Sequence, residues 1–336
     1  MKTRTETEET KSAAKPPKAA GPLVKVSPDG DGDADAGASA GDRVRITKAY
    51  KMYVGGAFVR SESGRYFRVA SADGVVGDAD PAGVNIPRGS RKDVRDAVLV
   101  AKGAYEKWET RTPFNRGQIL YRLAEVLESR APELERSLER AGATAGEAAR
   151  EVAATVDRAV FYAGFADKVS ALVASHNPVS GPHFGFSLPE AMGVVGVLAP
   201  RAPALLGLVS VVLPVITGGN SCVVVASDVD PRTAVVLSEC LATSDLPGGV
   251  VNVLTGYADE LGPILAKHRE VVALDVWSDD AALRASLERD AASSVKRVKT
   301  RELPDEAFWY DTRRGQGLGY IERTLETKTV WHPVGV

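Results

Sequence analysis

Residues 193–200 read GVVGVLAP, and from this point the chain alternates between short apolar runs and helical patterns. The run itself is typical of a buried strand, because it is uniformly apolar and bounded by glycine and proline. Further strands are predicted at 222–225, 250–254, 271–276 and 295–298, and helices at about 204–217, from Asp230-Pro231, at 259–268 and after Ser278. This alternation with short loops predicts βαβ units in an α/β, doubly wound, mostly parallel sheet of the Rossmann type.

The chain before this alternation is mainly helical. Residues 52–59 (MYVGGAFV) predict a strand, a turn and a strand, and residues 66–69 predict another short strand. Ser90 and Asp93 have the spacing of a capping box, so a helix is expected to begin there. A second helix follows, Pro132 opens a third at its first turn, and residues 144–173 predict one long Ala-rich helix.

Composition narrows the class of protein. The 336 residues are 44% hydrophobic and 26% charged, with a formal net charge of -2, which disfavours a nucleic-acid binder. Two cysteines and four histidines without metal-ligand spacing predict neither a disulfide-rich secreted module nor a metal site. We therefore expect a cytoplasmic protein. Residues 1–45 have no aromatic side chain and predict a disordered tail, and prolines interrupt the apolar stretch 194–216, which therefore predicts no membrane span.

Several segments resemble the aldehyde dehydrogenase superfamily. Residues 51–56 (KMYVGG) resemble its opening hairpin and residues 101–127 its early helices. GVVGVLAP at 193–200 and LPGGVVNVLTG at 246–256 resemble its two most distinctive Rossmann segments. The resemblance implies that residues 46–302 hold the N-terminal helices and an NAD-binding-type Rossmann domain, with an oligomerisation hairpin near residues 175–192.

The chain departs from this family where the oxyanion is normally stabilised. The strand GVVGVLAP is usually followed by Trp-Asn-Phe-Pro, whose Asn amide donates to the oxyanion. Here Arg201-Ala202-Pro203-Ala204 occupies the matching run, and the Ala202 side chain has no donor. Loss of one such donor typically lowers the rate about 100- to 1000-fold. The resemblance therefore predicts a site with a weakened oxyanion hole.

The nucleotide-binding positions depart as well. Ala226-Ser227 stands where the family has a Lys that holds the adenosine ribose. Asp228 or Asp230 could accept a ribose hydroxyl instead, although loop and helix-cap roles are favoured. Where the family's helix start receives pyrophosphate, residues 276–281 read VWSDDA, and we expect Asp279 and Asp280 to repel an anionic phosphate. These departures predict no cofactor, with NAD binding weak at most, and no cofactor-binding residue.

The family's catalytic residues are a general-base glutamate and a nucleophilic cysteine. Glu302 aligns with the general-base glutamate, but the nucleophilic cysteine normally lies downstream of it, and no cysteine follows Cys240 in this chain. Cys222 and Cys240 are expected to be core residues. We therefore predict that Glu302 is vestigial and that the chain has no catalytic residue.

The last part of the chain resembles a shortened family member. Residues 303–319 are polar and stand where the family has a catalytic domain, so they predict a linker that replaces it. Residues 320–336 contain YIERTLETKTV, which resembles the C-terminal oligomerisation strand of the family. The chain is thus predicted to be a degenerate, truncated member that keeps a small β oligomerisation element.

Three functions remain open. The first is a noncatalytic subunit that associates with an active aldehyde dehydrogenase or forms homodimers. The second is a divergent NAD(P)-dependent oxidoreductase that acts on an aldehyde, with its site completed by another chain. The third is a stand-alone nucleotide-binding regulator. Four histidines, His176, His183, His268 and His332, offer bases for the second, but none has a neighbouring nucleophile in the sequence.

Overall fold

The computed structural model describes residues 48–70 and 83–335. The predicted tail, residues 1–45, lies outside the described residues. The described chain begins with two short strand pairs and continues into a run of helices. This first part consists of β1 (Met52–Val54), β2 (Ala57–Val59), β3 (Tyr66–Val69), β4 (Val84–Pro87), α1 (Arg91–Glu109), α2 (Pro113–Ser129), α3 (Ala131–Arg140), α4 (Ala145–Phe165) and α5 (Val169–Val173). The predicted long helix is therefore two helices, because a turn at 166–168 separates α4 from α5.

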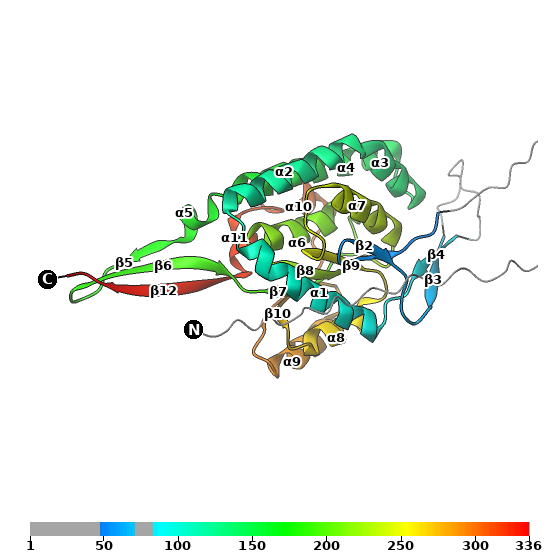
Figure 1. Cartoon of the computed structure of the whole chain (residues 1–336). Coiled ribbons are helices and arrows are strands. Elements are labelled where there is room, and N and C mark those ends of the chain that lie inside the picture. The colour runs from blue at the N-terminus through cyan, green and yellow to red at the C-terminus, as the bar shows by residue number, and fades with distance from the viewer. Residues whose placement is uncertain (1–47, 71–82, 336) are drawn as a thin grey trace, which may run out of the picture. The chain divides into compact units, whose positions relative to one another are not determined.

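The second part alternates strands and helices as predicted. It consists of β7 (Val194–Leu198), α6 (Leu206–Thr217), β8 (Ser221–Val225), α7 (Pro231–Thr243), β9 (Val251–Leu254), α8 (Ala258–Lys267), β10 (Val271–Trp277), α9 (Ala281–Ala292) and β11 (Arg297–Arg301). The sheet order is β11-β10-β7-β8-β9-β1-β2, and the first five strands are parallel (Figure 1). The predicted α/β doubly wound fold is confirmed.

Helices cover both faces of this seven-stranded sheet. Successive residues of a strand point to opposite faces, so a strand buried on both sides reads as a continuous apolar run. On β7, Val195 and Val197 pack in one core cluster with α2, α3, α4, α6 and α7. Val194 and Leu198 pack in a second cluster with α1, α8 and α9. The uniform apolarity of GVVGVL thus follows from its place in the middle of the sheet.

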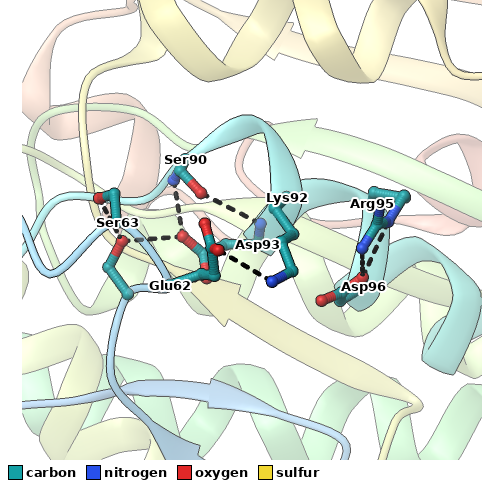
Figure 2. A network of polar contacts seen from close by, with 8 residues as sticks. Glu62, Ser63, Ser90, Lys92, Asp93, Arg95 and Asp96 are labelled. Atoms are coloured by element: carbon teal, nitrogen blue, oxygen red, sulfur yellow. Dashed lines mark hydrogen bonds and ion pairs between the residues drawn. The ribbon is translucent and has the colours of Figure 1, made fainter.

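Local capping fixes where the helices begin. Ser90 Oγ accepts the Asp93 N–H, and the Asp93 carboxylate accepts the Ser90 N–H at 2.8 Å, which is the predicted capping box (Figure 2). Asp93 also accepts the Glu62 N–H at 3.0 Å, and Lys92 pairs with Glu62 at 2.9 Å (Figure 2). The start of α1 is therefore tied to the loop that follows β2.

A separate three-stranded sheet brings the end of the chain back to its middle. It has the order β12-β6-β5, where β5 spans Ser175–Asn177, β6 His183–Ala191 and β12 Leu325–Pro333 (Figure 1). The strands β5 and β6 form the predicted hairpin, and β12 pairs antiparallel with β6 along all nine residues. A strand that only docks on another subunit would be unpaired within its own chain, but β12 completes a sheet of its own chain and leaves only its outer edge unpaired among the described residues.

The segment between β11 and β12 folds against the core. It carries α10 (Glu306–Tyr310) and α11 (Leu318–Glu322) in place of the predicted polar linker and the start of the predicted strand. Trp309 is 1% exposed and Ile321 is fully buried. Arg158 of α4 donates to the carbonyl oxygens of Trp309 at 2.6 Å and Gly315 at 2.5 Å. A short apolar run within polar sequence thus anchors the whole segment.

Candidate functional site

A crevice lies beyond the carboxyl ends of the parallel strands. Open α/β sheets bind ligands at this edge, because neighbouring loops diverge there. The crevice has a volume of about 160 Å³. The residues that define this strand-end crevice include Ala199, Arg201, Ser227, Asp228, Trp277 and Ser278. They come from the loops after β7, β8 and β10, so the topology of the sheet brings them together.

One ion pair crosses the loops of the strand-end crevice. Arg201 Nε donates to Asp228 Oδ1 at 2.8 Å, and Arg201 Nη2 donates to Asp228 Oδ2 at 3.2 Å. Ser227 Oγ donates to the Arg201 carbonyl oxygen at 2.8 Å, which holds the two loops together. The Arg201 side chain is 63% exposed, so its guanidinium remains accessible to an anionic group.

The two candidate ribose acceptors have different positions. Asp228 lines the strand-end crevice. Asp230 is the N-cap of α7, is 3% exposed and accepts the Thr233 N–H at 3.4 Å. Of these two candidates, Asp228 lines the crevice, whereas Asp230 has the helix-cap role that the sequence favoured.

The start of α9 differs from the sequence prediction. Asp280 is the N-cap, in place of Ser278, and its carboxylate accepts the N–H groups of Ala282 and Leu283 at 2.9 and 3.0 Å. Asp279 accepts the Leu303 N–H at 2.8 Å. Neither carboxylate belongs to the lining of the strand-end crevice. Direct contact of either carboxylate with a phosphate in this crevice is therefore not supported, and their expected repulsion of a phosphate stays a prediction.

Aromatic side chains close the base of the crevice. Trp277, at the end of β10, is 3% exposed, and its ring centroid lies 5.0 Å from that of Trp309. The Arg301 guanidinium carbon lies 4.8 Å from the Trp277 ring centroid. The sequence pattern did not indicate this cluster, because Trp309 lies in the predicted linker. The local run FWY at 308–310 was the signal that it would be buried.

A second cavity lies on the other side of the turn at 201–204. Its volume is about 500 Å³. We call it the acidic cavity, because its polar lining consists largely of carboxylates: Glu147, Glu151, Asp230, Asp279 and Glu306. Glu151 Oε1 accepts the N–H groups of Leu205 and Leu206 at 2.8 and 3.0 Å. Burial raises the pKa of the Glu151 carboxyl, and the charges of Asp230 and Glu306 raise it further.

The family's catalytic positions are not brought together. Glu302 is 78% exposed and pairs with Arg284 at 2.8 Å, and it lines neither the strand-end crevice nor the acidic cavity. Ala202 lines the acidic cavity without offering a side-chain donor. Cys222 and Cys240 are buried, as predicted. The vestigial role of Glu302 stays a prediction.

Within residues 48–70 and 83–335, no helix is both long and apolar enough to cross a membrane. The same residues contain no group of three or more His, Cys, Asp or Glu side chains that could hold a metal ion.

The sequence of this chain is similar to those of known aldehyde dehydrogenases. Residues 79–302 match the model of the aldehyde dehydrogenase family. The hydroxyisobutyraldehyde dehydrogenase of Mycolicibacterium austroafricanum is 33% identical over 222 residues, which are 66% of this chain and 42% of that protein. The chain spans at most about half the length of the curated relatives that it matches, 49% and 42% for two of them.

Solved structures that are similar to this chain are also aldehyde dehydrogenases, and they correct the expectation about the cofactor. The NAD-dependent aldehyde dehydrogenase of Sinorhizobium meliloti is 28% identical, with a TM-score of 0.67, over 75% of this chain and 50% of that one. An aldehyde dehydrogenase of Bacillus cereus, solved as an NAD+ complex, is 22% identical, with a TM-score of 0.69, over 76% and 51%. The expectation of no cofactor, with NAD weak at most, is contradicted by these findings. This chain belongs to the aldehyde dehydrogenase family.

Proposed function

We propose that this chain is an NAD-binding subunit that oxidises no aldehyde by itself and assembles with an active aldehyde dehydrogenase. The observation that carries the proposal is the burial of its two thiols, because Cys222 and Cys240 are both 0% exposed. Burial raises the pKa of the Cys222 thiol to about 12 and that of the Cys240 thiol to about 11. A thiol attacks a carbonyl carbon as the thiolate, so neither side chain is a nucleophile near neutral pH.

The strand-end crevice, at about 160 Å³, would hold only part of the dinucleotide. The Arg201 guanidinium would hold the pyrophosphate, because planar guanidinium groups bind phosphate oxygens in pairs. The Asp228 carboxylate would accept ribose hydroxyls, as acidic residues near the second strand of Rossmann domains do. When bound, NAD supplies hydride-transfer chemistry. The residues of this chain bind and orient it, and the reacting thiol would come from another chain.

The three-stranded sheet supports the assembly part of the proposal. Its edge strand β12 exposes one row of backbone groups, and Trp331 is 60% exposed and Phe184 46% exposed on the same sheet. Unpaired edges bind further strands, and aromatic anchors carry much of the binding energy of interfaces. In this proposal, residues 303–319 stand in for a catalytic domain, and residues 320–336 retain the oligomerisation role.

A second candidate is a divergent NAD(P)-dependent oxidoreductase whose site is completed by another chain. The acidic cavity favours it, because a chamber of about 500 Å³ next to the crevice has room for a small aldehyde. Glu151, which has a raised pKa, would be its acid or base. The two candidates differ in where the aldehyde is oxidised, so Glu151→Gln in this chain should lower the turnover of the assembled complex only if the second candidate holds.

Three measurements on the purified chain test the proposal. NAD should quench tryptophan fluorescence through Trp277, and Trp277→Phe should remove that signal while calorimetry still detects binding. No NADH should form with short aliphatic aldehydes. Turnover that disappears in Cys222→Ser would refute the noncatalytic role, and an absence of NAD binding would refute the cofactor assignment.

Coexpression tests the partner. A tagged full-length aldehyde dehydrogenase should copurify with this chain, and deletion of residues 324–336 should abolish the complex. Circular dichroism should show that the deleted chain keeps its helices, because the seven-stranded sheet has its own core. Unchanged affinity of the deleted chain would move the interface away from the three-stranded sheet.

A further inference from the structure

The outer edge of β12 carries a regular row of backbone groups. In an antiparallel pair, residues that exchange hydrogen bonds alternate with residues whose N–H and C=O groups point away from the partner strand. The Val334 N–H donates to the Pro182 carbonyl oxygen at 2.9 Å, which extends the register of β12 on β6 by one hydrogen-bonded pair. The even-numbered residues of β12 therefore bond to β6. The backbone groups that point outward belong to the odd-numbered residues, which are Leu325, Thr327, Thr329, Trp331 and Pro333.

This edge is open along most of its length. In residues 48–70 and 83–335, no strand pairs with the side of β12 that faces away from β6. The residues of β12 after Leu325 are exposed, apart from the half-buried Val330. One outward group has a partner, because Arg297 Nη1 of β11 donates to the Leu325 carbonyl oxygen at 2.5 Å. An open edge is a template for a further strand, and natural proteins usually shorten, bend or cover such edges.

We propose that two copies of this chain pair antiparallel through this edge, around a two-fold axis at Thr329. In a two-fold contact, if residue i lies opposite residue j, then j also lies opposite i. With Thr329 opposite Thr329 of the second copy, Thr327 lies opposite Trp331, and Leu325 lies opposite Pro333. The three-stranded sheets of the two copies then form one continuous sheet.

The ends of the strand support this register. Proline has no N–H, so Pro333 offers only a carbonyl oxygen, which accepts the Leu325 N–H of the second copy. The Leu325 carbonyl oxygen faces the N–H that Pro333 lacks, but it already accepts a hydrogen bond from Arg297. The residues between these ends exchange both backbone hydrogen bonds with the second copy: Thr327, Thr329 and Trp331. A shift that places Pro333 opposite Thr327 would leave the Thr327 carbonyl oxygen without a donor.

The side chains also fit this register. Side chains of directly opposite residues lie on the same face of a sheet, where like charges are destabilising. Glu326 lies opposite His332 of the second copy, and a carboxylate accepts a hydrogen bond from an imidazole N–H. Lys328 lies opposite Val330, and its charge is already paired with Glu190 at 2.9 Å. The register therefore places no like charges directly opposite each other.

Analytical ultracentrifugation of the purified full chain tests the proposal. We expect a species of twice the mass of the chain that dissociates on dilution. The measurement needs neither NAD nor an active aldehyde dehydrogenase, so its failure is distinct from a failure of the proposed function. The same edge serves the partner subunit in that proposal, so the homodimer and that complex exclude each other. A single-chain mass for the wild type would overturn the proposal.

Two variants at the axis separate the backbone from the side chain. Thr329→Pro removes an outward N–H but no hydrogen bond to the β6 backbone, and proline is tolerated on an edge strand where the N–H faces solvent. It should weaken the dimer roughly tenfold or more. Thr329→Val is the matched control, because it also loses the hydroxyl that bonds to Ser187 but keeps the N–H. It should dimerise as the wild type does, and equal dissociation constants for the two variants would contradict the proposal.

A pair of cysteine variants tests the register and does not depend on how the strand tolerates proline. Opposite residues that exchange hydrogen bonds have Cα atoms about 5.5 Å apart, and disulfides span about 4.4–6.8 Å. Mild oxidation should therefore link two copies of Thr329→Cys. Thr327→Cys is the control and should stay unlinked, because it lies opposite Trp331 and about 14 Å from its own counterpart. The native Cys222 and Cys240 are buried. No link in Thr329→Cys, or an equal yield in both variants, would exclude an axis at Thr329.

Discussion

The two sheets of this chain differ in how they are stabilised. In the seven-stranded sheet, every residue of β7 and of β8 is buried. In the three-stranded sheet, β12 has one buried residue, Leu325, and most of its other side chains are exposed. The first sheet is held by a core that this chain supplies by itself. The second leaves an aromatic surface and a free edge, which is the condition of an interface.

The largest expected effect contrasts two tryptophans. Trp309 is 1% exposed and Trp331 is 60% exposed. Trp309→Ala should lower the free energy of unfolding by about 3–5 kcal/mol, because a large cavity is left. Trp331→Ala should change it by about 0.5 kcal/mol at most and instead weaken binding of the partner subunit by about 2 kcal/mol. Urea unfolding and a pull-down assay measure the two quantities.

A matched leucine pair tests the same contrast within strands. Leu198 of β7 is 1% exposed, and Leu188 of β6 is 40% exposed. Leu198→Ala should destabilise the chain by about 2–5 kcal/mol, since the central sheet cannot collapse around the gap. Leu188→Ala should change the free energy of unfolding by at most about 0.5 kcal/mol. If urea unfolding shows that both variants lose the same free energy of unfolding, the three-stranded sheet has a core of its own.

The segment between the sheets depends on one buried cation. Arg158 is 3% exposed, and burial lowers its pKa. Arg158→Met should cost about 1–3 kcal/mol, because the carbonyl oxygens of Trp309 and Gly315 lose their donors. Hydrogen exchange should increase in residues 306–322 first. Arg95→Met, on the exposed face of α1, is the control and should leave both readouts unchanged.

The smallest effect is a pH dependence at two glutamates one turn apart on α4. Burial raises the pKa of Glu151 above the ordinary 4.5, so the folded chain keeps a proton that the unfolded chain loses. Stability from this group is present below pH 4.5 and is lost as the pH rises through the folded pKa. The backbone hydrogen bond from Thr144 lowers the pKa of Glu147, whose contribution is present above pH 4.5 and is lost as the pH falls.

Urea unfolding between about pH 3 and pH 7 separates the two groups. The difference in unfolding free energy between the wild type and Glu151→Gln should fall as the pH rises. The difference between the wild type and Glu147→Gln should rise with pH below 4.5. Slopes of the same sign would show that the environment of one glutamate has been assigned incorrectly.

Sequence patterns predicted the parts of the fold that are set by periodicity and local caps. The continuous apolar run at 193–198 and the Ser90 capping box needed no knowledge of distant residues. The errors fall where distant contacts decide. Trp309 is buried because Arg158 binds the segment that contains it, and β12 is paired because β6 lies 142 residues earlier in the chain, as the Ser187–Thr329 hydrogen bond shows.

The candidate site was harder to predict for the same reason. The family resemblance indicated the nucleotide-binding positions at 226–230 and 276–281, but it did not indicate the directions of the Asp279 and Asp280 carboxylates. Both side chains accept backbone N–H groups, one from Leu303 and one from the start of α9. A sequence gives the charge of such a residue but not the atom that it faces.

The pairing of β12 with β6 also sets an order of events during synthesis. Ser187 leaves the ribosome 142 residues before its partner Thr329. At about 5–20 residues per second, roughly 7 to 28 seconds pass in which β6 has only the three residues of β5 beside it. During that interval a strand from a neighbouring chain can take the position of β12. Such a swapped strand would keep β12 from pairing, so it competes with the proposed assembly, which uses the outer edge of β12.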